Sequence, residues 1–215
     1  MRRKRMKKFV VVLAVMICLI AVPGMAKDQP NTAAVTQFML AADHGFWGKK
    51  DGNVAGYVYS CIFYNFNDNY FAFYGYSGPK ITLGKFNIYP MVVMLADADA
   101  WLPGPSLWLE YTAGKNYFFL EGDYYIPWLA TSHGNSVVLP PHQYYSTFEY
   151  SRTLKDDVSL GFMTEVFGAF NEANPSELAF GPTLVFKKLK FWAFYDTTPL
   201  VDGYDYIGLR VKLSL

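Results

Sequence analysis

The last ten residues of the chain alternate between two kinds of side chain. The first set is aliphatic throughout: Ile207, Leu209, Val211, Leu213 and Leu215. The second set is small, polar, aromatic or charged: Tyr206, Gly208, Arg210, Lys212 and Ser214. Successive side chains of a β-strand point to opposite faces, so this pattern predicts a strand with one apolar and one mixed face. Similar alternation at 158–166 and 106–112 extends the prediction to much of the chain after Val54.

Turn signals set the register of two predicted hairpins. Gly84-Lys85 and Gly114-Lys115 each place glycine first, which is typical of a two-residue type II′ turn. In both hairpins the predicted register keeps apolar side chains opposite one another on one face. The pairs that follow are Leu83 with Phe86, Ile81 with Ile88, Leu109 with Leu120, and Tyr111 with Phe118. Further tight connections are predicted at Lys188-Leu189 and from Leu154 to Asp156.

Ten strands are predicted in all. They cover 54–64, 69–83, 86–96, 105–113, 116–126, 143–153, 157–169, 178–187, 190–197 and 204–215. Longer polar connections are expected at Asp97 to Gly104, Pro127 to Pro141, Asn171 to Ser176 and Thr197 to Gly203. Short and long connections thus alternate, as the periplasmic turns and outer loops of outer-membrane barrels do. An even count also returns the segment before the barrel to the periplasm. Twelve strands stay open if the segment around Phe38 is a strand and 69–96 divides differently.

A segment before the sheet has a different period. Asn31 is a good N-cap, Gly45 lies just past the end, and apolar residues between them follow helical i, i+3, i+4, i+7 spacing. These residues are Val35, Phe38, Met39 and Ala42. They predict a short amphipathic helix at about 32–43, within an amino-terminal segment 27–53 that precedes a barrel domain 54–215. This helix is expected either to brace the periplasmic mouth or to lie on the membrane surface.

The first 26 residues have the pattern of an export signal. Six basic residues precede an apolar run from Phe9 to Val22, and Gly24-Met25-Ala26 offers small residues for a signal peptidase. A membrane anchor is the alternative, but no second apolar stretch of helical length follows. Cleavage would leave 189 residues and change the net charge from +1 to −5, because the segment holds no acidic residue. An acidic chain without a basic cluster gives no reason to expect nucleic-acid binding.

The placement of aromatic and charged residues favours a membrane barrel over a soluble one. In a membrane barrel the apolar face meets lipid and the mixed face turns inward, the reverse of a soluble barrel. Aromatic residues near predicted strand ends are interpreted as interfacial girdles: Tyr57, Tyr59, Tyr76, Tyr89, Trp101, Trp128, Tyr144 and Tyr204. The mixed face carries charges of both signs, which are predicted to line a lumen: Glu110, Glu121, Asp123, Glu149, Glu165, Arg210 and Lys212.

The carboxyl-terminal stretch 206–215 resembles the insertion signal of Gram-negative outer-membrane β-barrel proteins. That resemblance rests on Tyr206, Gly208, Val211, Leu213 and Leu215, although Leu215 stands where the family usually has an aromatic residue. It implies an all-β, antiparallel up-and-down transmembrane barrel of about ten strands, with eight to twelve allowed, in the cell outer membrane. It also implies outer-membrane lipid, the barrel-assembly machinery and periplasmic chaperones as partners. The stretch 71–76 is faintly similar to a strand of Tsx-type channel proteins, and no binding residues are transferred from it.

Other chemistry is weakly represented in the sequence. Ser132 and His133 lie together in a polar loop without a nucleophile-elbow motif, so no catalytic residues are assigned. Rim carboxylates fall short of a calcium loop, and no metal or cofactor is predicted: Asp97, Asp99, Asp196, Asp202 and Asp205. Cys61 is expected to be a lipid-facing or packed thiol. The sequence thus favours a narrow porin-like channel for an unknown small solute, then a closed structural or surface-interaction barrel, then a barrel enzyme acting on lipids or esters.

Overall fold

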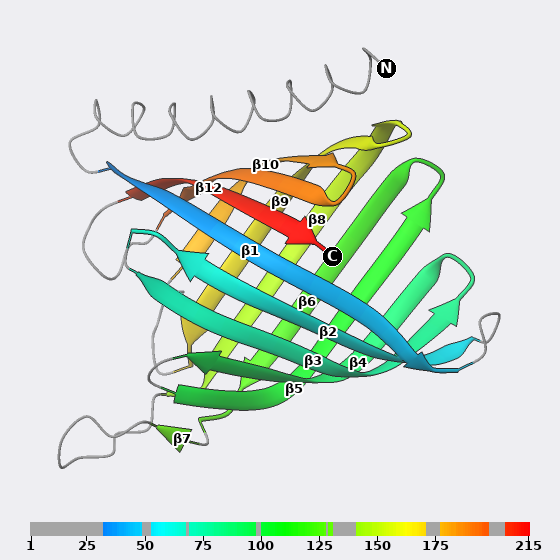
Figure 1. Ribbon diagram of the computed structural model, residues 1–215, viewed down its shortest axis with the longest axis horizontal. Helices are drawn as coiled ribbons and strands as arrows, with labels where there is room; N and C mark the ends of the chain where they lie inside the picture. The colour runs from blue at the N-terminus through cyan, green and yellow to red at the C-terminus, as the bar shows by residue number, and fades with distance from the viewer. Residues whose placement is uncertain are drawn as a thin grey trace.

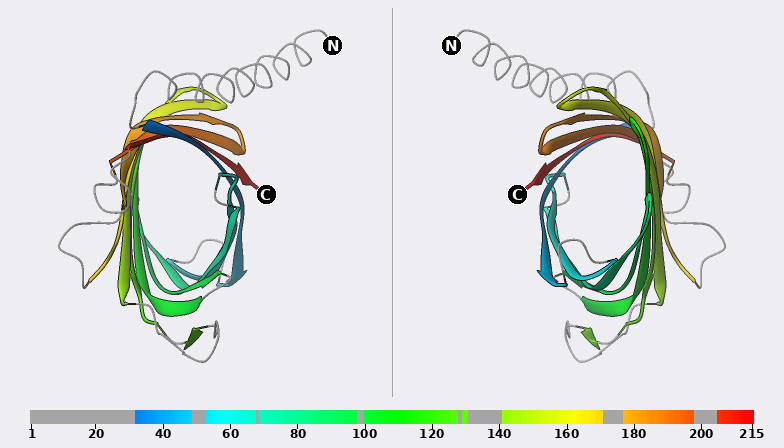
Figure 2. Two further views of the ribbon diagram at one scale, coloured as in Figure 1. Left: turned by 90° about the vertical axis from the view of Figure 1, so that its left-hand side faces the viewer. Right: turned by 90° about the vertical axis from the view of Figure 1, so that its right-hand side faces the viewer.

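The chain forms a closed β-barrel of oval cross-section (Figures 1 and 2). A computed structural model describes residues 32–48, 53–67, 69–97, 100–127, 129–130, 141–170, 177–197 and 205–215. Its strands are β1 (Thr32–Trp47), β2 (Val54–Asn65), β3 (Tyr70–Leu83), β4 (Phe86–Asp97), β5 (Ala100–Ala113), β6 (Asn116–Tyr125), β7 (Leu129–Ala130), β8 (Gln143–Lys155), β9 (Val158–Ala169), β10 (Glu177–Phe186), β11 (Leu189–Asp196) and β12 (Asp205–Ser214). The predicted all-β barrel fold is confirmed.

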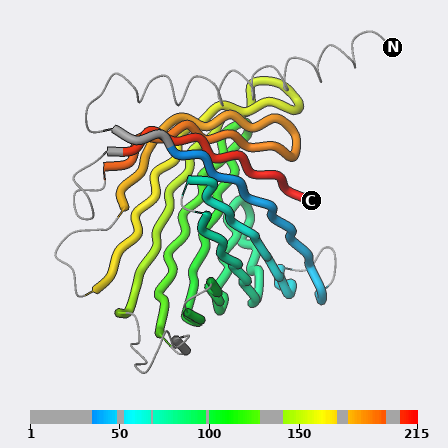
Figure 3. The backbone as a smooth tube through the Cα atoms, turned by 60° about the vertical axis from the view of Figure 1, so that its left-hand side comes forward, coloured from blue at the N-terminus to red at the C-terminus, as the bar shows by residue number. Residues whose placement is uncertain are grey.

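Eleven of these strands make the barrel wall. Neighbours along the chain pair antiparallel, β6 pairs with β8, and β1 closes the barrel against β12. The two-residue strand β7 pairs only with Ala100 and Trp101 at the start of β5. Eleven lies within the predicted eight to twelve, but the even number is wrong. With an odd number of alternating strands, the first and last must run parallel, and β1 and β12 do so (Figure 3).

The predicted helix at 32–43 is wrong, because this segment is the long strand β1. It pairs with β2 on one side and with β12 on the other, from Thr32 opposite Asp205 to Ala41 opposite Ser214. Apolar residues occupy both faces of β1, since Val35 is buried and Phe38 is 36% exposed. The alternation typical of a strand is therefore not visible in the sequence, and the apolar residues happen to follow a helical spacing. Tertiary pairing decides the outcome, because without β1 the edges of β2 and β12 would both be open.

Parallel closure also corrects the expected position of the chain ends. The start of β1 lies beside the start of β12, whereas Leu215 ends the chain at the opposite end of the barrel, where its amide donates to the Ala41 carbonyl at 2.8 Å. The even count had placed both ends of the barrel domain on one side. The tight turns after β3, β5, β8 and β10 lie at the same end as Leu215, since Ser214 donates to the Lys188 carbonyl.

The predicted hairpin registers are confirmed. Leu83 pairs with Phe86, Ile81 with Ile88, Leu109 with Leu120, and Tyr111 with Phe118. Gly84 and Gly114 have φ of 64° and 60°, whereas the lysines that follow keep negative φ, as a type II′ turn requires. The β10–β11 turn lies one residue earlier than predicted, at Lys187-Lys188, and the β8–β9 turn is Asp156-Asp157 after an irregularity at Leu154.

Strand β5 begins earlier than the sequence predicts. Pro103 and Gly104 were predicted to lie in the loop from Asp97 to Gly104, yet they pair with β4 as part of a continuous strand that also includes Pro105. Both prolines alternate with buried residues and so face outward, and the carbonyl of Pro103 still accepts a hydrogen bond from the Ile126 amide at 2.7 Å. The other predicted long connections lie largely outside the described residues.

Gly104 allows the close approach of β5 to the chain at Tyr124. A Cβ atom at this position would overlap the carbonyl oxygen of Tyr124, which is backbone and has little freedom to move. We expect Gly104→Ala to lower the free energy of unfolding by about 1–3 kcal/mol, as overpacked substitutions do. The matched control is Gly122→Ala, where nothing lies within 4 Å of the added atom. Urea titrations of the refolded barrel in detergent would test this, and equal stability of the two variants would contradict it.

Candidate functional site in the barrel interior

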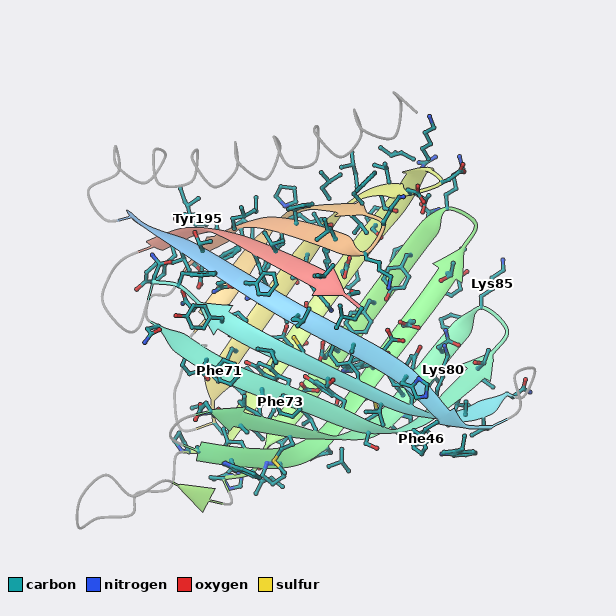
Figure 4. All side chains as sticks on the ribbon, viewed as in Figure 1. Phe46, Phe71, Phe73, Lys80, Lys85 and Tyr195 are labelled. Atoms are coloured by element: carbon teal, nitrogen blue, oxygen red, sulfur yellow. The ribbon has the colours of Figure 1, made fainter. Side chains whose placement is uncertain are left out.

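The outward face of the wall is apolar. Large hydrophobic side chains project from it around the barrel, among them Val92, Leu120, Phe148 and Leu160, which are 62%, 44%, 41% and 48% exposed. Along the middle of the described strands this face carries no Asp, Glu, Lys or Arg. Figure 4 shows the side chains on the strands and labels Phe71 and Phe73 of β3, which belong to this exposed set. Such a face suits contact with lipid hydrocarbon.

The inward face is identified by contacts between strands that are not neighbours in the wall. Tyr76 on β3 donates to Asp123 on β6 at 2.9 Å, although β4 and β5 lie between them. Arg210 on β12 reaches Glu165 on β9 past β10 and β11. Lys190 on β11 forms an ion pair with Glu149 on β8. Side chains that alternate in phase with these residues therefore face the interior.

Trp108 is the centre of an aromatic cluster inside the barrel. It is 6% exposed, and its ring lies against rings from four other strands. The ring centroids are 5.1 Å away for Tyr59, 4.7 Å for Tyr76, 5.5 Å for Phe119, 6.1 Å for Tyr89 and 6.4 Å for Tyr57. Since Tyr59 and Trp108 belong to strands separated by β3 and β4, this cluster fills interior space between β2 and β6.

The cluster corrects the interpretation of the aromatic girdle. Tyr57, Tyr59, Tyr76 and Tyr89 pack around Trp108 and do not face outward. Trp101, at 50% exposed, does lie on the outward face near the start of β5. Trp128 and Tyr204 lie outside the described residues. Alternation correctly groups these tyrosines on one face. That face was interpreted as lipid-facing because aromatic residues are typical of the membrane interface.

Arg210 joins three strands through a buried polar network. Its Nη1 donates to Glu165 Oε1 and its Nε donates to Gln37 Oε1 on β1, both at 2.6 Å. The guanidinium carbon also lies 4.8 Å from the Trp192 ring centroid and 5.4 Å from that of Phe63. Arg210 is 8% exposed and Glu165 3%. The network fixes the positions of β1, β9 and β12 relative to one another.

The acidic residues of β5 and β6 have mostly tyrosine partners. Glu110 accepts hydrogen bonds from Tyr89 at 2.6 Å and from Tyr117 at 3.1 Å, and Asn87 also donates to it. Asp123 accepts from Tyr76 and Tyr125, both at 2.9 Å. Glu121, two residues before Asp123 on the same face, is 8% exposed.

The interior of the described strands carries more acidic than basic side chains. Nine carboxylates alternate in phase with the inward residues: Asp43, Asp97, Glu110, Glu121, Asp123, Glu149, Glu165, Glu177 and Asp196. Four basic side chains do so: Lys80, Lys190, Arg210 and Lys212. The described interior thus has five more acidic than basic side chains.

The seven residues proposed from sequence all belong to this inward set. Sequence reasoning missed Lys190, Glu177 and the amide of Gln37, and it interpreted Asp196 as a carboxylate of the outer rim. Lys190 and Asp196 alternate with Trp192 and Phe194, and this mixed face was detectable once the turn was placed at Lys187-Lys188. Gln37 was hidden by the helix prediction.

The other singled-out residues have ordinary structural surroundings. Cys61 is 2% exposed and packs inside the barrel, so the packed alternative holds and the lipid-facing one is wrong. His44 and His142 are exposed, and Nδ1 of His142 lies 2.8 Å from the Tyr124 hydroxyl. Asp97 accepts from Tyr70, and Asp196 accepts from the Leu178 amide. Asp99, Asp202, Ser132 and His133 lie outside the described residues.

The residues of the carboxyl-terminal signal divide between the two faces of β12. Tyr206 and Gly208 face inward, and a Cβ on Gly208 would overlap the ring of Phe194. Val211 and Leu213 alternate onto the outward face. Their role in recognition during insertion stays a prediction, as does the faint similarity of 71–76 to Tsx-type channels.

Two searches of the described part of the chain gave negative results. No three His, Cys, Asp or Glu side chains among these residues come together in a way that could hold a metal ion. No helix in the same ranges is long and apolar enough to span a membrane.

Comparison with known proteins supports the fold through similarity to a solved structure. No protein-family model and no curated protein matches the sequence. Among solved structures, the chain is similar to a protein described as KdgM porin, with a TM-score of 0.51 and 12% sequence identity. The match covers 73% of this chain and 81% of the porin. At this identity the likeness concerns the fold alone, and it supports the β-barrel architecture described above.

Proposed function

We propose that this chain is an exported outer-membrane protein whose barrel forms a narrow channel for small solutes. The observation that carries the proposal is the reversal of polarity across the wall. The outer face is apolar along the middle of the described strands, whereas ten of these strands carry acidic or basic side chains on the inward face. Burying charged groups costs stability, and a barrel that served only as a scaffold would not need them. A polar interior therefore supports the passage of polar solutes through the barrel.

The channel is narrow for two reasons. An eleven-stranded barrel lies between the eight-stranded barrels that side chains fill and the porins of about 16–18 strands that enclose a wide aqueous channel. The interior is also crossed by the Trp108 cluster and by the Arg210–Glu165 pair. On this proposal the physical partners are lipid around the wall and, during biogenesis, periplasmic chaperones and the barrel-assembly machinery. We assign no catalytic residues.

The second candidate function is a closed barrel that acts through structure or surface contacts. The observation that favours it is the same interior packing, since the aromatic cluster around Trp108 fills much of the space between β2 and β6. The two candidates differ in conductance, and Trp108 is the side chain whose removal separates them.

We expect the refolded protein to conduct in a planar bilayer and Trp108→Ala to raise its single-channel conductance by about twofold or more, because a wider constriction offers less resistance. The matched control is Phe148→Ala, which removes an aromatic ring from the lipid-facing side and leaves the interior unchanged. Insertion is checked independently by heat-modifiable mobility in gels. Inserted protein that stays silent both with and without Trp108 would establish the closed barrel instead.

A further inference from the structure

One patch of the inner wall contains three buried polar atoms without a regular hydrogen bond among the described residues. Ser106 and Trp108 on β5 are the direct cross-strand neighbours of Asp123 and Glu121 on β6. All four face inward and are between 4% and 8% exposed. The indole Nε1 of Trp108 has no hydrogen-bond partner, and neither Asp123 Oδ1 nor Ser106 Oγ makes a hydrogen bond of normal geometry within the described residues.

The two carboxylates of this patch also lack a paired cation. In the described strands, Glu149 pairs with Lys190 and Glu165 pairs with Arg210, but no lysine or arginine forms a salt bridge with Glu121 or Asp123. Lys212 interacts with Glu121 electrostatically at longer range, and its ammonium lies 5.0 Å from the Tyr59 ring centroid. Two carboxyl groups that are so deeply buried are costly as anions unless they bind a proton or a positive charge comes close, and a cation in the interior satisfies the second condition.

The rings around the patch define what kind of positive charge fits. Tyr59 and Tyr76 lie against Trp108, so aromatic rings adjoin the carboxylate pair. Aromatic rings attract alkylated ammonium groups through cation–π interactions, and the free indole N–H offers a donor to an acceptor on the same molecule. The described interior has five more acidic than basic side chains, which favours cations over anions along the path.

We propose that the interior prefers cations to anions and that Glu121, Asp123 and Trp108 form a binding site for small organic ammonium ions. This inference rests on the proposed channel for its selectivity, but the binding site is testable without conductance. Small organic cations are then the class of solute that the interior attracts.

Selectivity is measured from the reversal potential of the inserted protein in a KCl gradient. We expect potassium to permeate better than chloride, and the double variant E121Q/D123N to lower the permeability ratio by about threefold or more, because two interior carboxyl groups are removed. The matched control D156N/D157N removes two carboxylates from the exposed β8–β9 turn and should leave the ratio nearly unchanged. A conducting protein that prefers chloride, or whose preference is unaffected by E121Q/D123N, would overturn the inference.

Binding is measured by tryptophan fluorescence of the refolded protein in detergent during titration with tetramethylammonium chloride. We expect a saturable change that disappears in Trp108→Phe and weakens at least about tenfold in E121Q/D123N, since both charges attract the same ion. If the protein binds this probe but does not conduct, the binding site is supported and the proposed channel is contradicted. If the protein conducts but shows no saturable binding, the binding site is contradicted and the proposed channel is supported.

Discussion

We expect Arg210→Met to lower the free energy of unfolding by about 3–5 kcal/mol, because it leaves the Glu165 carboxylate buried without its cation. Glu165 is 3% exposed, and its remaining hydrogen-bond donor is the Tyr145 hydroxyl at 2.6 Å. Gln37 loses its partner as well, so the strands β1, β9 and β12 lose their shared contact. Urea titration of the refolded barrel in detergent gives the value.

The double variant R210M/E165Q separates a lost charge partner from lost packing. Methionine retains much of the arginine stem that lies near Trp192 and Phe63, and glutamine removes the uncompensated charge. We therefore expect the double variant to be more stable than Arg210→Met alone, as replaced buried pairs often are. A loss equal to the sum of the two single losses would show that the ion pair has no energetic coupling.

The matched control is an ion pair of the same type at the surface. Lys187 and Asp157 lie 3.8 Å apart at the barrel rim, with side chains 59% and 51% exposed. Exposed pairs of this kind contribute about 0–1 kcal/mol, so Lys187→Met should change stability by no more than that. A comparable loss at both positions would mean that burial of the Arg210 network is not the source of its effect.

Local signals in the sequence predicted most of the wall. Gly84 and Gly114 each fix a turn, and a fixed turn sets which residues of the adjoining strands face each other. That is why the Leu109–Leu120 and Leu83–Phe86 pairs were predictable from spacing alone. The turn at Lys187 carries no glycine, although its φ is 58°, and there the prediction moved by one residue.

Long-range closure could not be predicted in the same way. Whether 32–47 is a helix or a strand depends on its pairing with β2, the next strand, and with β12 near the other end of the sequence, and no local pattern encodes the pairing with β12. The same holds for the interior site. Alternation placed Glu165 and Arg210 on the mixed face, but it could not show that these two residues, 45 positions apart in the chain, form a direct hydrogen bond.

The assignment of the apolar outward face to lipid can be tested by a substitution that should change the free energy of unfolding strongly. Leu120 lies near the middle of β6, is 44% exposed, and is flanked on the outward face by Leu109 and Phe148. If this face meets hydrocarbon, Leu120→Arg should lower the unfolding free energy by about 2–4 kcal/mol in lipid vesicles.

Depth in the membrane supplies the control for that substitution. Leu83 is also exposed, at 56%, but it adjoins the Gly84-Lys85 turn at the end of the barrel. Near the interface arginine reaches water and headgroups, so Leu83→Arg should change stability by only about 0–1 kcal/mol. In a soluble barrel both leucines would face water, and both substitutions would be nearly neutral. A large difference between the two variants in vesicles therefore reports lipid contact directly, whereas two small effects would place the apolar face outside any membrane.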